Sequence, residues 1–152
     1  MTVIESVPEA MASLRRLLTG PFGLDAPAWL ATAEQAWAGP SPRPSRRVAV
    51  PVWRDPWMVV GARTFVGDVL ARLGLDNVFG AGPDRYPHVE AGQIRTAAPD
   101  LVLLPDEPYP FSAGDGPEEF PAQRVVLLPG RLLTWYGPSL ATARADLLRV
   151  IG

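Results

Sequence analysis

The chain of 152 residues fits a single domain, and without cysteine it has neither a disulfide framework nor a thiolate metal site. Its formal net charge is −2, and its 14 basic residues, all arginine, are scattered, which excludes the clustered basic face of a nucleic-acid-binding protein. No run of about 18 apolar residues occurs, so the sequence predicts no membrane-spanning helix.

Two helices are predicted in a helical segment over residues 1–38. An S-x-x-E capping box begins at Ser6, and apolar residues follow at helical spacing as far as Gly20. A second helix is expected over 26–38, with Trp37 on its apolar face. This all-helical start contrasts with the alternating pattern of the rest of the chain.

A proline-rich linker over 39–47 separates the helical segment from an α/β lobe over 47–152. The lobe opens with an apolar run over 48–52, typical of a buried strand, and then brings two tryptophans, Trp53 and Trp57. Beside the strand, Trp53 is expected to pack, whereas Trp57 is expected to face a ligand. The alternative is that both indoles are core, since aromatic side chains bury a large apolar area.

Strands and helices alternate through the lobe. The pattern predicts a helix over 64–74, a short edge strand at 78–79, a helix over 89–98, a strand over 101–104, a loop over 106–116, a strand over 124–128 and a last helix starting near 138. Such alternation indicates βαβ units. We therefore expect an α/β fold of three layers, α/β/α, with a short mainly parallel sheet preceded by the helical segment.

Aromatic residues gather in four loops that follow strands or precede helices. Because the carboxyl ends of parallel strands share one edge, these loops can converge into an apolar face for a bulky ligand. Alternatively, each aromatic residue holds its own loop in place. The residues are Trp53, Trp57, Tyr86, Tyr109, Phe111, Trp135 and Tyr136.

Catalytic and metal motifs are weak. His88 is the sole histidine, so no histidine pair can bind a metal, and no glycine-rich phosphate loop is present. Asp106 and Glu107 follow a predicted strand and could act as an acid/base pair, cap backbone amides or receive a cationic part of a ligand. An α/β enzyme or regulatory domain using His88, Asp55 and Glu107 stays open as an alternative.

Five segments carry a family resemblance. In order they read WRDPWMVVG (53–61), LGLDNVF (73–79), YPHVEAGQIRTAAPDLVLL (86–104), EPYPF (107–111) and WYG (135–137). This order resembles the C-terminal lobe of the helical-backbone substrate-binding proteins of ABC importers, which bind cobalamin, haem and iron–siderophore complexes. The resemblance covers about half of the family's two-lobed fold, so it implies a single lobe.

The resemblance implies a non-catalytic receptor domain for a metal chelate, with no cofactor of its own. It places aromatic residues that stack on the ligand at three positions, with further contacts at neighbouring ones. The implied stacking residues are Trp57, Tyr86 and Trp135, and the neighbouring contacts are Arg54, Tyr109 and Tyr136.

The resemblance also implies partners. Family members present one carboxylate per lobe to arginines of the permease, in the helix after the Tyr86 position; Gly92 stands near that place, and Glu90 is the carboxylate two residues earlier. We expect a second lobe or a second copy to cover the aromatic face. With Glu5 and Glu9 near its start, the chain as written is expected to be cytoplasmic, and extracytoplasmic if it is part of a full-length receptor. A protein-interaction module is the remaining alternative.

Overall fold

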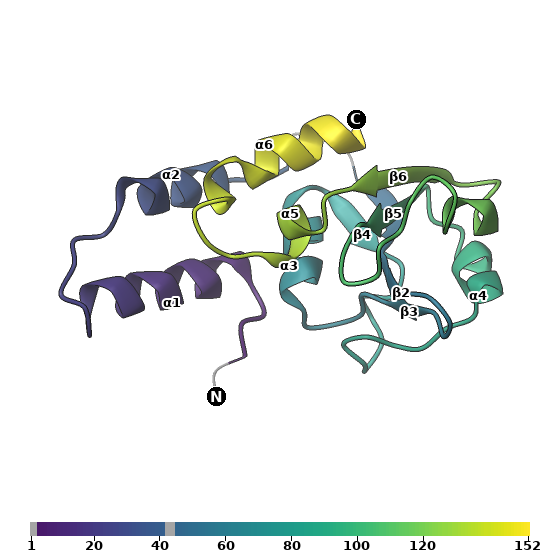
Figure 1. Ribbon diagram of the computed structural model, residues 1–152, viewed down its shortest axis with the longest axis horizontal. Helices are drawn as coiled ribbons and strands as arrows, with labels where there is room; N and C mark the ends of the chain where they lie inside the picture. Colours follow the sequence, from purple (N-terminus) through teal and green to yellow (C-terminus); the bar gives the residue numbers. More distant parts are fainter. Residues whose placement is uncertain (1–2, 42–44) are drawn as a thin grey trace.

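A four-stranded parallel sheet forms the centre of the molecule (Figure 1). The computed structural model describes residues 3–41 and 45–152. The sheet has the order β4-β1-β5-β6, and every neighbouring pair in it is parallel. Its strands are β1 (Arg46–Ala49), β4 (Leu75–Asn77), β5 (Leu101–Pro105) and β6 (Arg124–Leu128). The predicted α/β class with a short, mainly parallel sheet is confirmed.

The helices begin close to where the sequence predicts, except for the short helix α5 (Arg131–Thr134), which is not predicted. They are α1 (Val7–Thr19), α2 (Ala28–Ala36), α3 (Phe65–Arg72), α4 (Ala91–Thr96), α5 (Arg131–Thr134) and α6 (Leu140–Ile151), with a 3₁₀ turn η1 (Pro117–Glu119). Side-chain caps start two of them: Ser6 Oγ accepts from the Glu9 N–H at 3.3 Å, and Thr64 Oγ1 accepts from the Gly67 N–H at 2.9 Å. Within the described residues, no helix has the length and apolar character needed to cross a bilayer.

Two strand predictions need correction. The run over 48–52 is not one strand: β1 ends at Ala49, and β2 (Pro51–Trp53) leaves the sheet to form an antiparallel hairpin with β3 (Met58–Val59). The edge strand is 75–77 rather than 78–79, because it is these residues that pair with β1.

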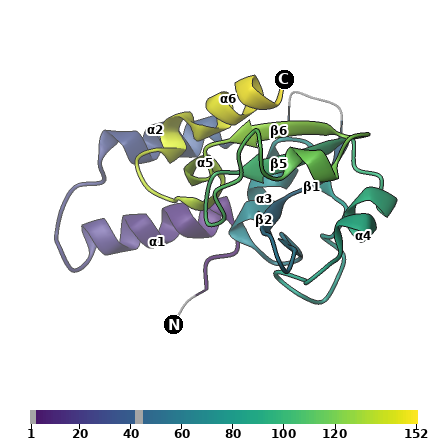
Figure 2. The same ribbon diagram turned by 45° about the vertical axis from the view of Figure 1, so that its right-hand side comes forward.

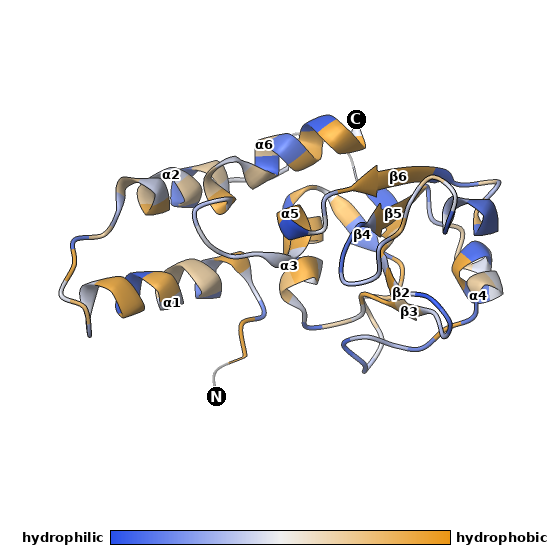
Figure 3. Cartoon of the chain, viewed as in Figure 1, coloured by the Kyte–Doolittle hydropathy of each residue, from blue (hydrophilic) through white to orange (hydrophobic). Residues whose placement is uncertain are grey.

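Alternate residues of the strands face two different layers. On one face, Val48, Leu101 and Leu103 belong to a core shared with helices α1, α2, α3, α5 and α6. On the other, Ala49 and Leu104 pack with the β2–β3 hairpin, α4 and the loop after β5. β5 is therefore buried on both faces, in keeping with its apolar colour in Figure 3, whereas the edge strand β6 leaves Leu127 exposed.

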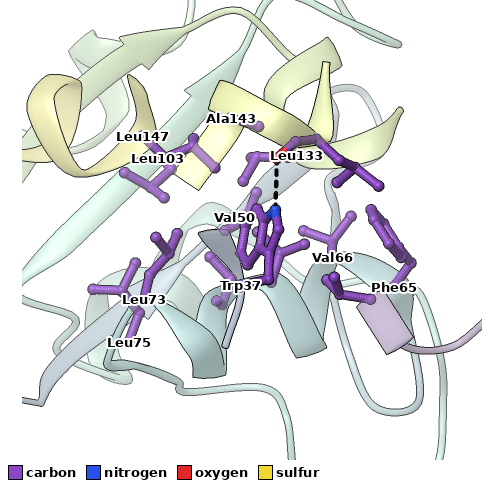
Figure 4. Close-up of a cluster of buried hydrophobic side chains, with 14 of the residues drawn as sticks. Trp37, Val50, Phe65, Val66, Leu73, Leu75, Leu103, Leu133, Ala143 and Leu147 are labelled. Atoms are coloured by element: carbon purple, nitrogen blue, oxygen red, sulfur yellow. Dashed lines mark hydrogen bonds between the residues drawn. The ribbon is translucent and has the colours of Figure 1, made fainter. Parts of the chain in front are cut away.

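The helical segment shares its core with the lobe. Buried Trp37 lies among lobe residues such as Val50 and Leu133, and its Nε1–H donates to the Leu140 carbonyl at 2.9 Å (Figure 4). Figures 1 and 2 both show α2 running alongside α6, while the loop between α1 and α2 projects away from the sheet. Of the predicted linker, residues 42–44 lie outside the described residues. The boundary at 39–47 thus separates stretches of sequence that pack into one core.

Candidate functional site

An apolar pocket of about 530 Å³ lies where the loops at the carboxyl ends of the strands meet. The segments that follow β1, β5 and β6 each contribute to its wall, as expected for loops that share one edge of a parallel sheet. Its lining residues are Val52, Trp53, Met58, Val66, Tyr86, Glu107, Pro108, Thr134 and Trp135. The predicted convergence of aromatic loops therefore occurs, although not with every predicted residue.

Three aromatic side chains on this wall are exposed. Trp53 and Tyr86 are each 42% exposed, and Trp135 is 59% exposed. Large aromatic side chains are usually buried because they carry much apolar area, so three exposed ones around one pocket leave apolar surface in contact with water. Two of the three, Tyr86 and Trp135, were predicted to bind a ligand. The third, Trp53, was expected to pack in the core.

The exposures of the two hairpin tryptophans are the reverse of those expected. Trp57 is only 7% exposed, stacks on Phe111 with 5.8 Å between ring centroids and meets Phe120 edge-on at 5.5 Å. The reason is the hairpin: the chain reverses between Trp53 and Trp57, so the second indole turns toward the loop after β5 instead of outward. As a ligand-stacking residue, Trp57 has no exposed face in this structure.

Arg54 is held by carboxylates of the loop after β5 and of the 3₁₀ turn. Its guanidinium pairs with Asp115 and Glu118 and lies 5.4 Å from the Trp57 ring centroid. The hydrogen bond with Glu118 raises the pKa of Arg54 and lowers the pKa of Glu118. Arg54 is not part of the pocket wall, so in this arrangement its charge serves to fasten the hairpin.

Tyr109 and Tyr136 are not among the residues of the pocket wall. Tyr109 donates its hydroxyl to Asp115 Oδ2 at 2.6 Å, which raises the pKa of the phenol, and its ring meets Trp53 edge-on at 5.6 Å. Tyr136 is exposed, but its ring contacts the ring of Phe65 edge-on, with centroids 5.3 Å apart. Tyr109 therefore packs against the exposed Trp53, and a ligand contact by either tyrosine stays a prediction.

Asp106 and Glu107 differ in their surroundings. Asp106 Oδ1 accepts the Gly130 N–H at 2.7 Å, which is the backbone-capping role considered from sequence. Glu107 lines the pocket, and its Oε1 is buried without a hydrogen-bond partner among the described residues. The other polar lining side chain, Thr134, donates its hydroxyl to the Gly130 carbonyl at 3.0 Å. The wall thus carries one carboxyl group in a mainly apolar surface.

The residues of the enzyme alternative do not meet at the pocket. Asp55 and His88 are exposed and absent from its wall, and His88 forms an isolated backbone bridge with Met58. Among the described residues, no group of three or more acidic or histidine side chains could hold a metal ion. Glu90 is exposed just before α4, where its N–H donates to Gln93 Oε1 at 2.6 Å, and permease docking there stays a prediction.

Sequence reasoning missed part of the wall. Val52, Val66 and Met58 are ordinary apolar residues of a strand, a helix and a hairpin, and nothing in the sequence separates them from the core.

The buried Arg144, outside the pocket wall, was also not predicted. It is 8% exposed and donates to five backbone carbonyls, those of Ala36, Ala38, Gly39, Pro40 and Arg72. A signal for Arg144 existed, because it follows Ala143 directly on the apolar face of α6.

Comparison with known proteins finds likeness in structure alone. No protein-family model matches the chain, and no curated protein does. Among solved structures, a possible iron-binding (periplasmic solute-binding) protein from Staphylococcus epidermidis has a TM-score of 0.74 at 18% identity, over 97% of this chain and 63% of that one.

Two further solved structures are also similar in fold to most of this chain. The periplasmic haem-binding protein BhuT, in complex with two haems, has a TM-score of 0.70 at 26% identity, over 93% of this chain and 62% of its own. The periplasmic vitamin B12-binding protein BtuF of Vibrio cholerae has a TM-score of 0.60 at 15% identity, over 80% of this chain and 48% of its own. The chain therefore spans about half to two thirds of these structures, and in fold it is one lobe of a periplasmic binding protein.

Proposed function

We propose that the chain is a non-catalytic ligand-binding lobe of an ABC-importer receptor, and that its aromatic pocket forms one wall of a cleft for a metal chelate such as haem, a corrinoid or a ferric siderophore. The observation that carries this proposal is the gathering of exposed Trp53, Tyr86 and Trp135 around an apolar hollow at the carboxyl edge of the sheet. Ligands of open α/β sheets bind at this edge. The structural neighbours, described as binding proteins for iron, haem and vitamin B12, support the same class.

The chemistry of the wall suits such a ligand. A volume of about 530 Å³ falls within the range of small-molecule sites, roughly 300–1,000 Å³. Flat, polarisable ring systems gain about 0.5–1.5 kcal/mol from each well-placed aromatic contact beyond the area that they bury. The indoles of Trp53 and Trp135, both in the pocket wall, offer two such contacts.

The open side of this wall has to be covered by another surface when a ligand is bound. Three exposed aromatic side chains leave one side of a bound chelate open to water unless something closes over it. We propose that a second lobe supplies the cover, or a second copy of this chain in its place. In this assembly Glu90 would face an ABC permease, and the lobe would work outside the cytoplasm, as its periplasmic neighbours do.

Tryptophan fluorescence tests the proposal directly. The protein is titrated with haem, cyanocobalamin and ferrioxamine B, and we expect saturable quenching by at least one of them. Because only one wall is present, we expect a Kd of roughly 1–100 µM. Trp135→Ala should weaken that binding by about two- to tenfold.

The matched control is Phe22→Ala, which removes an exposed aromatic side chain from the loop between α1 and α2, outside the pocket wall. Its affinity should equal that of the unaltered protein. Binding by none of the three chelates, or equal binding by the Trp135→Ala and unaltered proteins, would contradict the proposal.

A further inference from the structure

Among the described residues, the pocket wall carries a single carboxyl group. Among the described residues that line it, Glu107 is the only acidic one, and none is an arginine. The nearest arginine in sequence to the exposed indole of Trp53 is Arg54, which is already paired with Asp115 and Glu118. A ligand seated on this wall therefore meets one carboxyl group and no cation.

Glu107 is held firmly in place. Its neighbour Asp106 accepts the Gly130 N–H at 2.7 Å, just where β5 ends and α5 is about to begin. Gly130 packs so closely that a Cβ added there would lie 2.6 Å from Glu107 Cγ and 2.7 Å from the Glu107 carbonyl oxygen. The backbone that carries the carboxyl group is thus packed closely against Gly130.

The carboxyl group is also incompletely hydrogen-bonded. Its Oε1 is buried and has no partner among the described residues, although it belongs to a side chain of the pocket wall. A buried acceptor without a donor is unfavourable, and a carboxylate more so than a neutral group. Glu107 as a whole is only partly buried and lines the pocket, so its carboxyl group attracts a ligand edge that carries N–H or ammonium groups, whereas a ligand that brings its own carboxylate is repelled in a site of low dielectric constant.

We infer that Glu107 determines the charge class of the ligand: it selects chelates whose edge carries N–H donors, cationic ones above all, over chelates whose edge carries carboxylates. This inference rests on the proposed function, since it concerns the ligand of the same wall. Within the proposed class of metal chelates, it distinguishes ligands by the charged groups on the edge of the ring system.

The test keeps the ring constant and changes only its periphery. Haem with its two propionates, the corresponding bis-propionamide and the bis-(2-aminoethyl)amide, which ends in two ammonium groups, are titrated against the protein. We expect affinity to rise in that order, with at least tenfold between haem and the ammonium derivative. In Glu107→Gln that ratio should fall below threefold, and Glu107→Asp, which keeps the charge, should retain part of it.

Asp76→Asn is the control for net charge, because it removes one exposed carboxylate that does not line this pocket. It should leave the ratio unchanged. Equal affinities of the unaltered protein for all three compounds, or a uniform shift of all three in Glu107→Gln, would overturn the inference while leaving the aromatic wall in place. Binding of none of them would overturn the wall and the inference together.

Discussion

Replacing Arg144 by methionine should loosen the junction between the helical segment and the lobe. The buried guanidinium reaches from α6 to the end of α2 and the residues after it, and also to the end of α3. Methionine retains much of the aliphatic stem, so the change removes mainly the hydrogen bonds. The carbonyls at the end of α2 would then lose a cation that also complements the helix dipole.

The size of the effect follows from the contacts. Four carbonyls lie within 3.1 Å of the guanidinium nitrogens of Arg144, and a fifth lies at 3.5 Å. At about 1 kcal/mol net for each of the four short bonds, the upper bound is about 4 kcal/mol. Arg144 Nε has no partner among the described groups, which reduces that benefit. We therefore expect a loss of about 3 kcal/mol in the free energy of unfolding, or roughly 6–12 °C in Tm.

Urea denaturation followed by circular dichroism measures this loss. Arg149→Met is the matched control, since Arg149 lies on the same helix, is exposed and, within the described part of the chain, pairs only with Asp146 three residues before it. Its effect should stay below about 0.5 kcal/mol. A loss below about 1 kcal/mol for Arg144→Met, or equal losses for both variants, would refute the reasoning.

Three smaller predictions concern the site's surroundings. Gly130→Ala should cost about 1–3 kcal/mol, because its Cβ would lie 2.6 Å from Glu107 Cγ; an unchanged urea midpoint would contradict this. Trp57→Ala should cost about 3–5 kcal/mol as a core truncation, and a change in Tm below about 3 °C would contradict its buried placement. Arg54 lowers the pKa of Glu118, so the stabilisation is complete above the ordinary carboxyl pKa of about 4.3 and is lost as the pH falls through the lowered value. The difference in Tm between the unaltered protein and Glu118→Gln should therefore be present at about pH 7 and shrink below about pH 4. A difference that stays constant down to about pH 2 would count against it.

The sheet could be predicted because its central strands are short and buried. Continuous apolar runs such as 101–104 and 125–128 are typical of such strands, and β5 and β6 contain these runs. Helix starts were also readable, since Ser6 and Thr64 cap backbone N–H groups as their sequence positions suggest. Local chemistry decides these features, so a local pattern is enough to find them.

The exposure of the two hairpin tryptophans could not be predicted in the same way. Whether an indole faces water depends on what packs against the hairpin, and Phe111 and Phe120 reach Trp57 from a loop more than fifty residues away in the sequence. The same holds for Val66 and Met58, which join the pocket wall through tertiary packing. The sequence could indicate which loops meet, but not which side of each loop faces the hollow.

Fluorescence quenching in single-tryptophan replacements tests the aromatic wall most directly. The ligand found in the titrations is added to Trp53→Phe, Trp135→Phe and Trp37→Phe variants. We predict that replacing either exposed indole lowers the fraction of emission quenched at saturation, whereas replacing buried Trp37, which is absent from the pocket wall, does not lower it. Equal quenched fractions in Trp53→Phe, Trp135→Phe and the unaltered protein would contradict the account.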